Sequence, residues 1–105
     1  MNILFMGTPE FALPTLKALH HSSHSLLAVI TQPDKPKGRG QKLLVSPIKQ
    51  YALDFNLPIL QPKTVNDPEF IGSLQKNQPD IIIVIAFGQI LSENFLKIPK
   101  QFCIN

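Results

Sequence analysis

The chain has 105 residues, of which 44% are apolar and 16% are charged, and its formal net charge is +3. That length suits one domain with one hydrophobic core, and the apolar fraction is too high for a disordered chain. A single cysteine excludes an internal disulfide framework. The longest strongly apolar run, residues 81–87, is far shorter than the ~20 residues that a membrane span needs. The N-terminus lacks the basic region of a signal peptide, so we expect a cytoplasmic protein.

The first part of the chain predicts a strand, a helix and a second strand. Residues 1–6 form a short apolar run, and leucines recur on one helical stripe within 13–19. We expect regular helix only from about residue 14, because Pro14 further inside a helix would cost a hydrogen bond. Residues 26–30 form the second apolar run. The stretch 33–45 is predicted to be one long irregular loop, and loops of that length are usually functional or disordered.

The rest of the chain alternates helices with strands. Ser46-Pro47 and Asp67-Pro68 each place an N-cap residue before a proline, and apolar residues at helical spacing follow both. Apolar runs predict strands at 57–60, 81–87 and, as the start of a fifth, 102–104, and a short helix is expected at 92–98.

None of the apolar runs alternates with polar residues. Continuous apolar runs of this length are typical of strands that are buried on both faces, which indicates a parallel sheet with helices on either side. The alternation of strands and helices therefore predicts a doubly wound α/β domain with right-handed crossovers. We expect the strand that ends at residue 104 to lie at an edge of the sheet.

Ligands of open α/β sheets bind beyond the carboxyl ends of the strands. This rule selects residues 7–9, the loop after Ile30, residues 87–91 and Asn105. The turn that starts at Gly7 has only the first glycine of a G-x-G-x-x-G motif. Close approach of the backbone to a pyrophosphate needs the other two glycines, so NAD and FAD are disfavoured.

The predicted loop after the second strand is basic. It holds four of the ten basic residues, including the only arginine: Lys35, Lys37, Arg39 and Lys42. Two glycines, Gly38 and Gly40, flank the arginine. A flexible cationic loop at the ligand edge of a sheet favours contacts to phosphate, as in RNA or nucleotide binding. The alternative is an ordinary solvated basic loop.

Two further positions at the strand ends carry functional hypotheses. Gly88 lets the chain turn as it leaves the most buried strand, so that backbone groups of the next residues are free to pair with a flat heterocycle. The alternative is an ordinary strand exit. Asn105 follows the last apolar run, where its carboxamide could donate a hydrogen bond to a developing oxyanion.

The histidines and the cysteine are interpreted as structural. His21 and His24 have the i, i+3 spacing of a metal pair, but no carboxylate or cysteine lies near them in the sequence. With His20 they cluster near the end of the first predicted helix, where they complement its dipole. We therefore predict no metal site. Cys103 lies in an apolar run and is expected to be a buried thiol.

Five segments resemble the methionyl-tRNA formyltransferase family in order and spacing. They are FMGTPEFA at 5–12, TQPDKPKGRG at 31–40, SPIK at 46–49, AFGQIL at 86–91 and CIN at 103–105. The resemblance implies a Rossmann-like doubly wound parallel sheet, the formyltransferase fold. It also implies that residues 1–105 are the N-terminal part of the catalytic domain, without the remainder of that domain and without the C-terminal tRNA-binding domain.

The resemblance further implies transfer of a formyl group from 10-formyltetrahydrofolate to the α-amino group of methionyl initiator tRNA. In that reaction Asn105 is the catalytic asparagine that stabilises the oxyanion. The histidine and aspartate that the family uses come later in its motif, so we expect residues 1–105 alone to be inactive. The resemblance assigns folate binding to Phe87, Gly88, Gln89, Ile90 and Leu91. It assigns tRNA binding to Lys35, Lys37, Gly38, Arg39, Gly40 and Lys42. The intact enzyme is expected to be monomeric.

Two alternative functions remain open at this point. One is another enzyme that uses 10-formyltetrahydrofolate, such as a sugar-amine formyltransferase or formyltetrahydrofolate dehydrogenase. Those relatives lack the insertion around Arg39. The other is a non-catalytic RNA-binding module on an α/β scaffold, which the basic loop and the net charge of +3 would suit.

Overall fold

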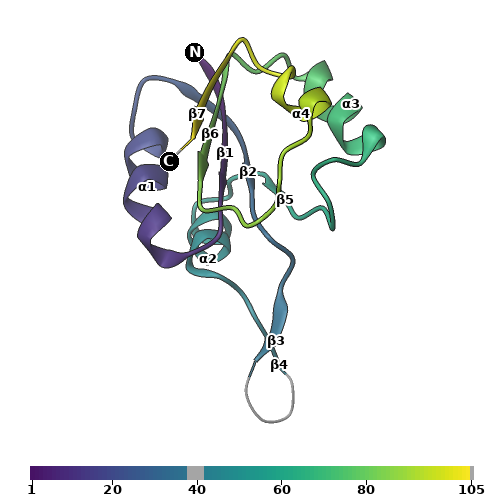
Figure 1. Ribbon diagram of the computed structural model, residues 1–105. Helices are drawn as coiled ribbons and strands as arrows, with labels where there is room; N and C mark the ends of the chain where they lie inside the picture. The colour runs from purple at the N-terminus through teal and green to yellow at the C-terminus, as the bar shows by residue number, and fades with distance from the viewer. Residues whose placement is uncertain (38–41, 105) are drawn as a thin grey trace.

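The computed structural model describes residues 1–37 and 42–104, and it describes only the backbone of residues 36, 37, 42, 43 and 102–104. Within this part of the chain, five parallel strands form one sheet in the order β5-β2-β1-β6-β7 (Figure 1). The strands are β1 Asn2–Gly7, β2 Ser25–Ile30, β5 Ile59–Leu60, β6 Ile81–Ile85 and β7 Gln101–Ile104. This arrangement confirms the predicted doubly wound α/β fold.

The strand order places a topological switch point beside the first strand. The chain winds from β1 outward through β2 to β5, and then returns to the other side of β1 as β6 and β7. Adjacent strands β1 and β6 therefore lead to connections on opposite faces of the sheet. Doubly wound folds bind ligands outside the carboxyl ends of the strands at such a point.

Helices cover both faces of the sheet. They are α1 Leu13–His20, which follows a short 3-10 turn η1 Glu10–Ala12, then α2 Pro47–Asp54, α3 Pro68–Lys76 and α4 Glu93–Leu96. Helices α1 and α2 lie on one face, and α3 and α4 lie on the other (Figure 1). None of the helices in residues 1–37 and 42–104 is long and apolar enough to cross a membrane.

The predicted helix starts are confirmed. The side chain of Ser46 accepts a hydrogen bond from the backbone of Lys49, and Asp67 and Ser92 cap α3 and α4 in the same way. Pro14 falls in the first turn of α1, where its missing N–H has no helical partner to lose. The structure thus explains why a helix tolerates this proline.

Alternate residues of the strands build two hydrophobic cores. Leu4 and Met6 of β1 point into the cluster beneath α3 and α4, whereas Phe5 points into the cluster beneath α1 and α2. All three side chains are fully buried. Because both faces of β1 are covered, its sequence is a continuous apolar run and does not alternate.

The stretch 33–45 differs from its prediction. The structure forms a two-stranded antiparallel ribbon there, β3 Lys35–Lys37 with β4 Lys42–Leu44, so the prediction of one irregular loop was wrong. Lys35 pairs with Leu44, and Lys37 pairs with Lys42. Figure 1 shows that this hairpin projects away from the sheet. The two strands have three residues each, and the apolar run at their end, Leu43-Leu44-Val45, was predicted as part of the loop because it is short and follows a polar, glycine-rich stretch.

Candidate functional site

The carboxyl ends of the central strands bring polar side chains together. Thr8 follows β1, Gln32 follows β2 and Gln61 follows β5. The Thr8 hydroxyl oxygen accepts a hydrogen bond from the backbone N–H of Gln32 at 3.3 Å. The amide of Gln61 donates to the backbone carbonyl of Gln32 at 3.1 Å. Gln32 therefore links three adjacent strand ends through its main chain.

The side chain of Gln32 reaches a fourth strand end, that of β6. Its Nε2 donates to the carbonyl of Phe87 at 2.9 Å, and its Oε1 accepts from Nε2 of Gln89 at 3.1 Å. Gln89 is itself held on both sides, because Nε2 also donates to the carbonyl of Lys63 and Oε1 accepts from the backbone N–H of Val65. The side-chain amides of Gln32 and Gln89 thus connect the end of β6 to the end of β2 by hydrogen bonds.

The segment 86–91 has an unusual backbone. Ala86 has φ of 47° and Gly88 has φ of 96°. A positive φ is uncommon for a residue with a Cβ, and such conformations persist where the surroundings enforce them. A Cβ on Gly88 would also lie only 3.2 Å from Nε2 of Gln32. The conformation and the close approach both explain why glycine occupies this position.

Two carbonyl groups of this segment already have partners. Phe87 is bonded by Gln32, and the carbonyl of Ile90 accepts from Nδ2 of Asn66 at 2.8 Å. No described residue accepts a hydrogen bond from the backbone N–H groups of residues 88–91. The backbone groups that this segment offers to a ligand therefore include these four donors. The side chain of Ile90 stands beside them and is 90% exposed.

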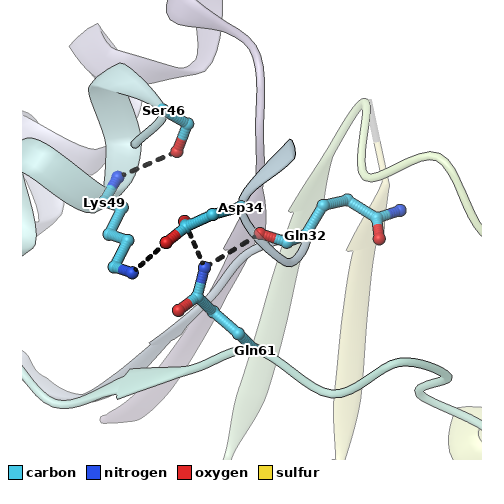
Figure 2. A network of polar contacts seen from close by, with 5 residues as sticks. All are labelled: Gln32, Asp34, Ser46, Lys49 and Gln61. Atoms are coloured by element: carbon cyan, nitrogen blue, oxygen red, sulfur yellow. Dashed lines mark hydrogen bonds and ion pairs between the residues drawn. The ribbon is translucent and has the colours of Figure 1, made fainter. Parts of the chain in front are cut away.

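An ion pair ties the base of the hairpin to α2. The carboxylate of Asp34 accepts from Nζ of Lys49 at 2.7 Å and from the amide of Gln61 at 3.0 Å (Figure 2). The hydrogen bond from Lys49, and after it that from Gln61, lowers the pKa of Asp34 below its ordinary value. Because Gln61 also bonds the carbonyl of Gln32, the hairpin base and the strand exits share one polar network.

A cavity of about 450 Å³ lies between the hairpin base, the start of α2 and the strand exits. Its apolar lining comes mainly from Pro33, Leu44, Val45 and Pro47, and its polar lining includes Thr8 and Asp34. A group bound there would contact both the hairpin and the switch point.

The profile of the formyl transferase family matches residues 1–105, the whole of the sequence. The chain belongs to the formyl transferase family. It is also similar to curated proteins named methionyl-tRNA formyltransferase. Identity is 51% over 105 residues with the protein of Geobacter sulfurreducens and 50% over 105 residues with that of Clostridioides difficile. It is 54% over 104 residues with that of Trichlorobacter lovleyi. The alignments cover 99–100% of this chain and 33–34% of the relatives, so the chain spans about a third of their length.

The sequence assigned folate binding to residues 87–91 of this formyl transferase domain. These residues follow β6 and lie at the switch point. Gly88, Gln89 and Ile90 lie in the loop after β6, whereas the side chain of Phe87 is buried in the core beside α3 and α4, and Leu91 is partly buried against it. One detail differs from the prediction, because not all backbone groups of the segment are free. The carbonyls of Phe87 and Ile90 are occupied.

The residues assigned to tRNA gather on the hairpin, as far as the structure describes them. The side chain of Lys35 is exposed on β3. Lys37 and Lys42 face each other as the last described pair of the ribbon. Gly38, Arg39 and Gly40 lie outside the described residues. The neighbouring Lys49 forms an ion pair with the carboxylate of Asp34.

Asn105 also lies outside the described residues. The residue before it, Ile104, ends β7 and pairs with Val84 of β6. Cys103 belongs to β7, but the prediction that its thiol is buried concerns a side chain outside those described. Asn105 thus directly follows a strand that neighbours the exit of β6 in the sheet.

The histidines have structural partners. Nδ1 of His20 lies 2.7 Å from the hydroxyl of Tyr51, and Nδ1 of His24 lies 3.0 Å from the N-terminal ammonium group. Burial raises the pKa of Tyr51. Among the described residues, no group of three or more His, Cys, Asp or Glu side chains could hold a metal ion.

Sequence reasoning missed the amide side chains that organise the site. Gln32, Gln61 and Asn66 are separated by long stretches of chain, and although Gln32 lies in the segment 31–40 that resembles the family, none of the three was assigned a role. Their place in the sequence could have identified two of them, because Gln32 and Gln61 each follow directly or almost directly on an apolar run that predicts a strand.

Proposed function

We propose that this chain supplies the formyl-donor site and a tRNA contact of a methionyl-tRNA formyltransferase. The reaction moves the formyl group of 10-formyltetrahydrofolate to the α-amino group of methionyl initiator tRNA, in translation initiation. One observation carries the proposal: two proteins with that name are 51% and 50% identical to this chain over all of its 105 residues. The reaction belongs in the cytoplasm, where translation begins, and we expect the intact gene product to act as a monomer.

The proposed donor site is the segment 86–91 at the switch point. Backbone N–H groups without acceptors among the described residues suit the carbonyl and ring nitrogen acceptors of a pterin. The exposed side chain of Ile90 offers an apolar contact to the flat face of the ring. The missing second and third glycines after β1 are consistent with a folate and disfavour a dinucleotide.

The proposed tRNA contact is the hairpin. Lys35, Lys37 and Lys42 belong to the two strands of the hairpin, and Arg39 lies between these strands in the sequence. Phosphates are the groups that such a set of basic residues binds. Gly38 and Gly40 flank the arginine. The cavity at the base of the hairpin would then receive a group that extends from the bound tRNA end toward the donor site.

The proposed chemistry is an acyl transfer. The methionyl amine attacks the formyl carbon, a new carbon–nitrogen bond forms and the bond from that carbon to N10 of the folate breaks. The amine loses one proton and N10 gains one. The carboxamide of Asn105 donates to the formyl oxygen as negative charge develops there.

The hairpin separates this proposal from its closest alternative. A sugar-amine formyltransferase or a formyltetrahydrofolate dehydrogenase would use the same donor, but neither needs a basic element for a polynucleotide. A non-catalytic RNA-binding module, in turn, would need no ligand-ready segment at the switch point. The site that we propose contains both features.

The test compares acceptors with the intact gene product. Radiolabelled 10-formyltetrahydrofolate is incubated with methionyl initiator tRNA, with a nucleotide-linked sugar amine, or with neither. We expect label on the aminoacyl-tRNA alone. Label on the sugar amine would support the other transferase, and binding of tRNA without any transfer would support the RNA-binding module.

A further inference from the structure

We propose that Gln32 is a positioning residue that holds the segment 86–91 in its ligand-ready shape. The proposal rests on the function above only in naming the ligand as a folate. The hydrogen bonds that carry it belong to the protein itself. In the proposed reaction Gln32 touches no reacting atom. It acts through its hydrogen bonds to the backbone of Phe87 and the side chain of Gln89.

Every polar group of Gln32 is used to join strand ends. Its backbone N–H donates to Thr8, and its backbone carbonyl accepts from Gln61. Its side-chain amide donates to the carbonyl of Phe87 at 2.9 Å and accepts from Gln89 at 3.1 Å. Figure 2 shows that the main chain of Gln32 faces Asp34 and Gln61, while its side chain extends in the opposite direction, away from them. The residue thus bridges the exits of four strands.

The segment needs such a support because its backbone is strained. Positive φ angles at Ala86 and Gly88 turn the chain sharply after β6. The positive φ of Ala86 is costly for a residue with a Cβ and persists only where neighbouring groups enforce it, whereas glycine adopts a positive φ freely. Gly88 lies so close to Gln32 that an added Cβ would be 3.2 Å from Nε2. The side-chain amide therefore fits against the turn itself as well as bonding the carbonyl before it.

The chemistry requires an amide at this position. Phe87 presents an acceptor to the side chain, and Gln89 presents a donor. Glutamine can satisfy both at once, because one end of its amide donates and the other accepts. A carboxylate would accept from Gln89 but would place negative charge against the Phe87 carbonyl. A neutral carboxyl group could satisfy both again, since its O–H donates.

These requirements define three variants of the intact gene product. Gln32→Met keeps the length of the side chain but removes the donor and the acceptor. Gln32→Glu keeps the acceptor and supplies a donor only when protonated. Gln50→Met is the matched control, because the exposed Gln50 amide donates to Asp54 within α2 and takes no part in the hydrogen bonds of Gln32.

The first measurement is amide hydrogen exchange without ligand. Gln32→Met should increase exchange at residues 86–91 several-fold and leave β1 and β2 as protected as in the wild type. Gln50→Met should leave exchange at 86–91 unchanged. This readout does not depend on the identity of the ligand.

The second measurement is the Kd for tetrahydrofolate at pH 7.5 and pH 5, expressed relative to the wild type at the same pH. Loss of one positioned hydrogen bond predicts an increase of about 3- to 10-fold for Gln32→Met at both pH values. Gln32→Glu should be as weak at pH 7.5 and should recover toward the wild type at pH 5. The nearest charged groups of the network, Asp34 and Lys49, pair with each other, and the lowered pKa of Asp34 keeps that carboxylate ionised at both pH values.

The outcomes separate this inference from the proposed function. If the wild type does not bind tetrahydrofolate, the donor assignment fails, and hydrogen exchange alone decides the role of Gln32. Unchanged exchange at 86–91 in Gln32→Met would overturn the positioning role. So would a wild-type Kd in that variant, or a loss in Gln32→Glu that is equal at both pH values.

Discussion

The shape of the site depends on the positive φ angle of Gly88, which glycine adopts more readily than other residues do. Its φ of 96° suits glycine, and the Gln32 amide occupies the space where a side chain would begin. A substitution there combines backbone strain with a contact that must move. The effect should therefore appear in stability as well as in binding.

Gly88→Ala is expected to destabilise the protein by about 1–2 kcal/mol, since alanine disfavours positive φ. Chemical denaturation would measure the change. Gly72→Ala is the matched control, because Gly72 lies inside α3 with open space around it. That substitution should stabilise by about 0.5–1 kcal/mol through helix propensity. A Gly88→Ala protein as stable as the wild type would contradict the strained turn.

Asp34 makes the hairpin base sensitive to acid. Its pKa is lowered in the folded state, so its contribution to stability is complete above its ordinary value of 3.8 and is lost as the pH falls through the lower folded value. Denaturation of the wild type and Asp34→Asn between pH 7 and pH 2.5 should give a difference in stability that shrinks below about pH 4.

The partner residue provides the control for this titration. In a Lys49→Met background, the hydrogen bond and charge of Lys49 are gone, and only the hydrogen bond from Gln61 still lowers the pKa of Asp34. Asp34→Asn should then change the acid dependence far less. Equal acid dependence with and without Lys49 would show that the pair does not hold the carboxylate ionised.

For single residues, the sequence predicted where a residue lies in the fold better than which residues it forms hydrogen bonds with. Gly88 was identified as a turn because it ends an apolar run, and the structure agrees. The bonds among Gln32, Gln61 and Gln89 were not predicted, because they join residues that are adjacent only after the strands assemble. No local spacing encodes such contacts.

At the scale of elements, α2 connects the hairpin to the core. Its N-cap Ser46 accepts from the backbone of Lys49, and Lys49 in turn holds Asp34. Ile48 and Ala52 are buried in the core that α2 shares with α1 and the sheet. A short helix of eight residues depends on both its cap and this burial.

Ser46→Ala should cost about 1 kcal/mol, because it leaves the first turn of α2 without its side-chain acceptor. Thermal unfolding would measure the loss, and Ser46→Asp should retain most of the stability because it keeps an acceptor at the N-cap. Alanine and aspartate variants of equal stability would argue against the cap.

The hairpin should contribute a salt-dependent term to tRNA affinity. For the intact gene product, Lys35→Gln is expected to lower the slope of log K against log salt by about 0.7–0.9, the value of one phosphate contact. Lys76→Gln, at the end of α3, removes the same charge away from the hairpin and should leave the slope unchanged. Equal slopes for both variants would place the tRNA elsewhere.

Elements with strong local signals were predictable, and the hairpin was not. Strands β1, β2 and β6 are continuous apolar runs, and α2 and α3 start at a cap followed by proline. Strands β3 and β4 are held by pairing with each other outside the core, so burial leaves no pattern in their sequence.

At the scale of the whole molecule, strand order decides where chemistry is possible. The order β5-β2-β1-β6-β7 places the exits of β1 and β6 at the switch point and puts β7, which precedes Asn105, next to β6. The alternation of elements predicted this class of fold, but the order of the strands depends on tertiary packing. We therefore propose that formyl transfer takes place at the carboxyl edge of this sheet.

The most direct test of that claim is the rate of formyl transfer from 10-formyltetrahydrofolate to methionyl initiator tRNA by the intact gene product and its Asn105→Ala variant. Removing an oxyanion donor predicts a kcat lower by about 100- to 1,000-fold, with KM values for both substrates little changed. A variant that transfers formyl groups at a rate within twofold of the wild type would contradict the account.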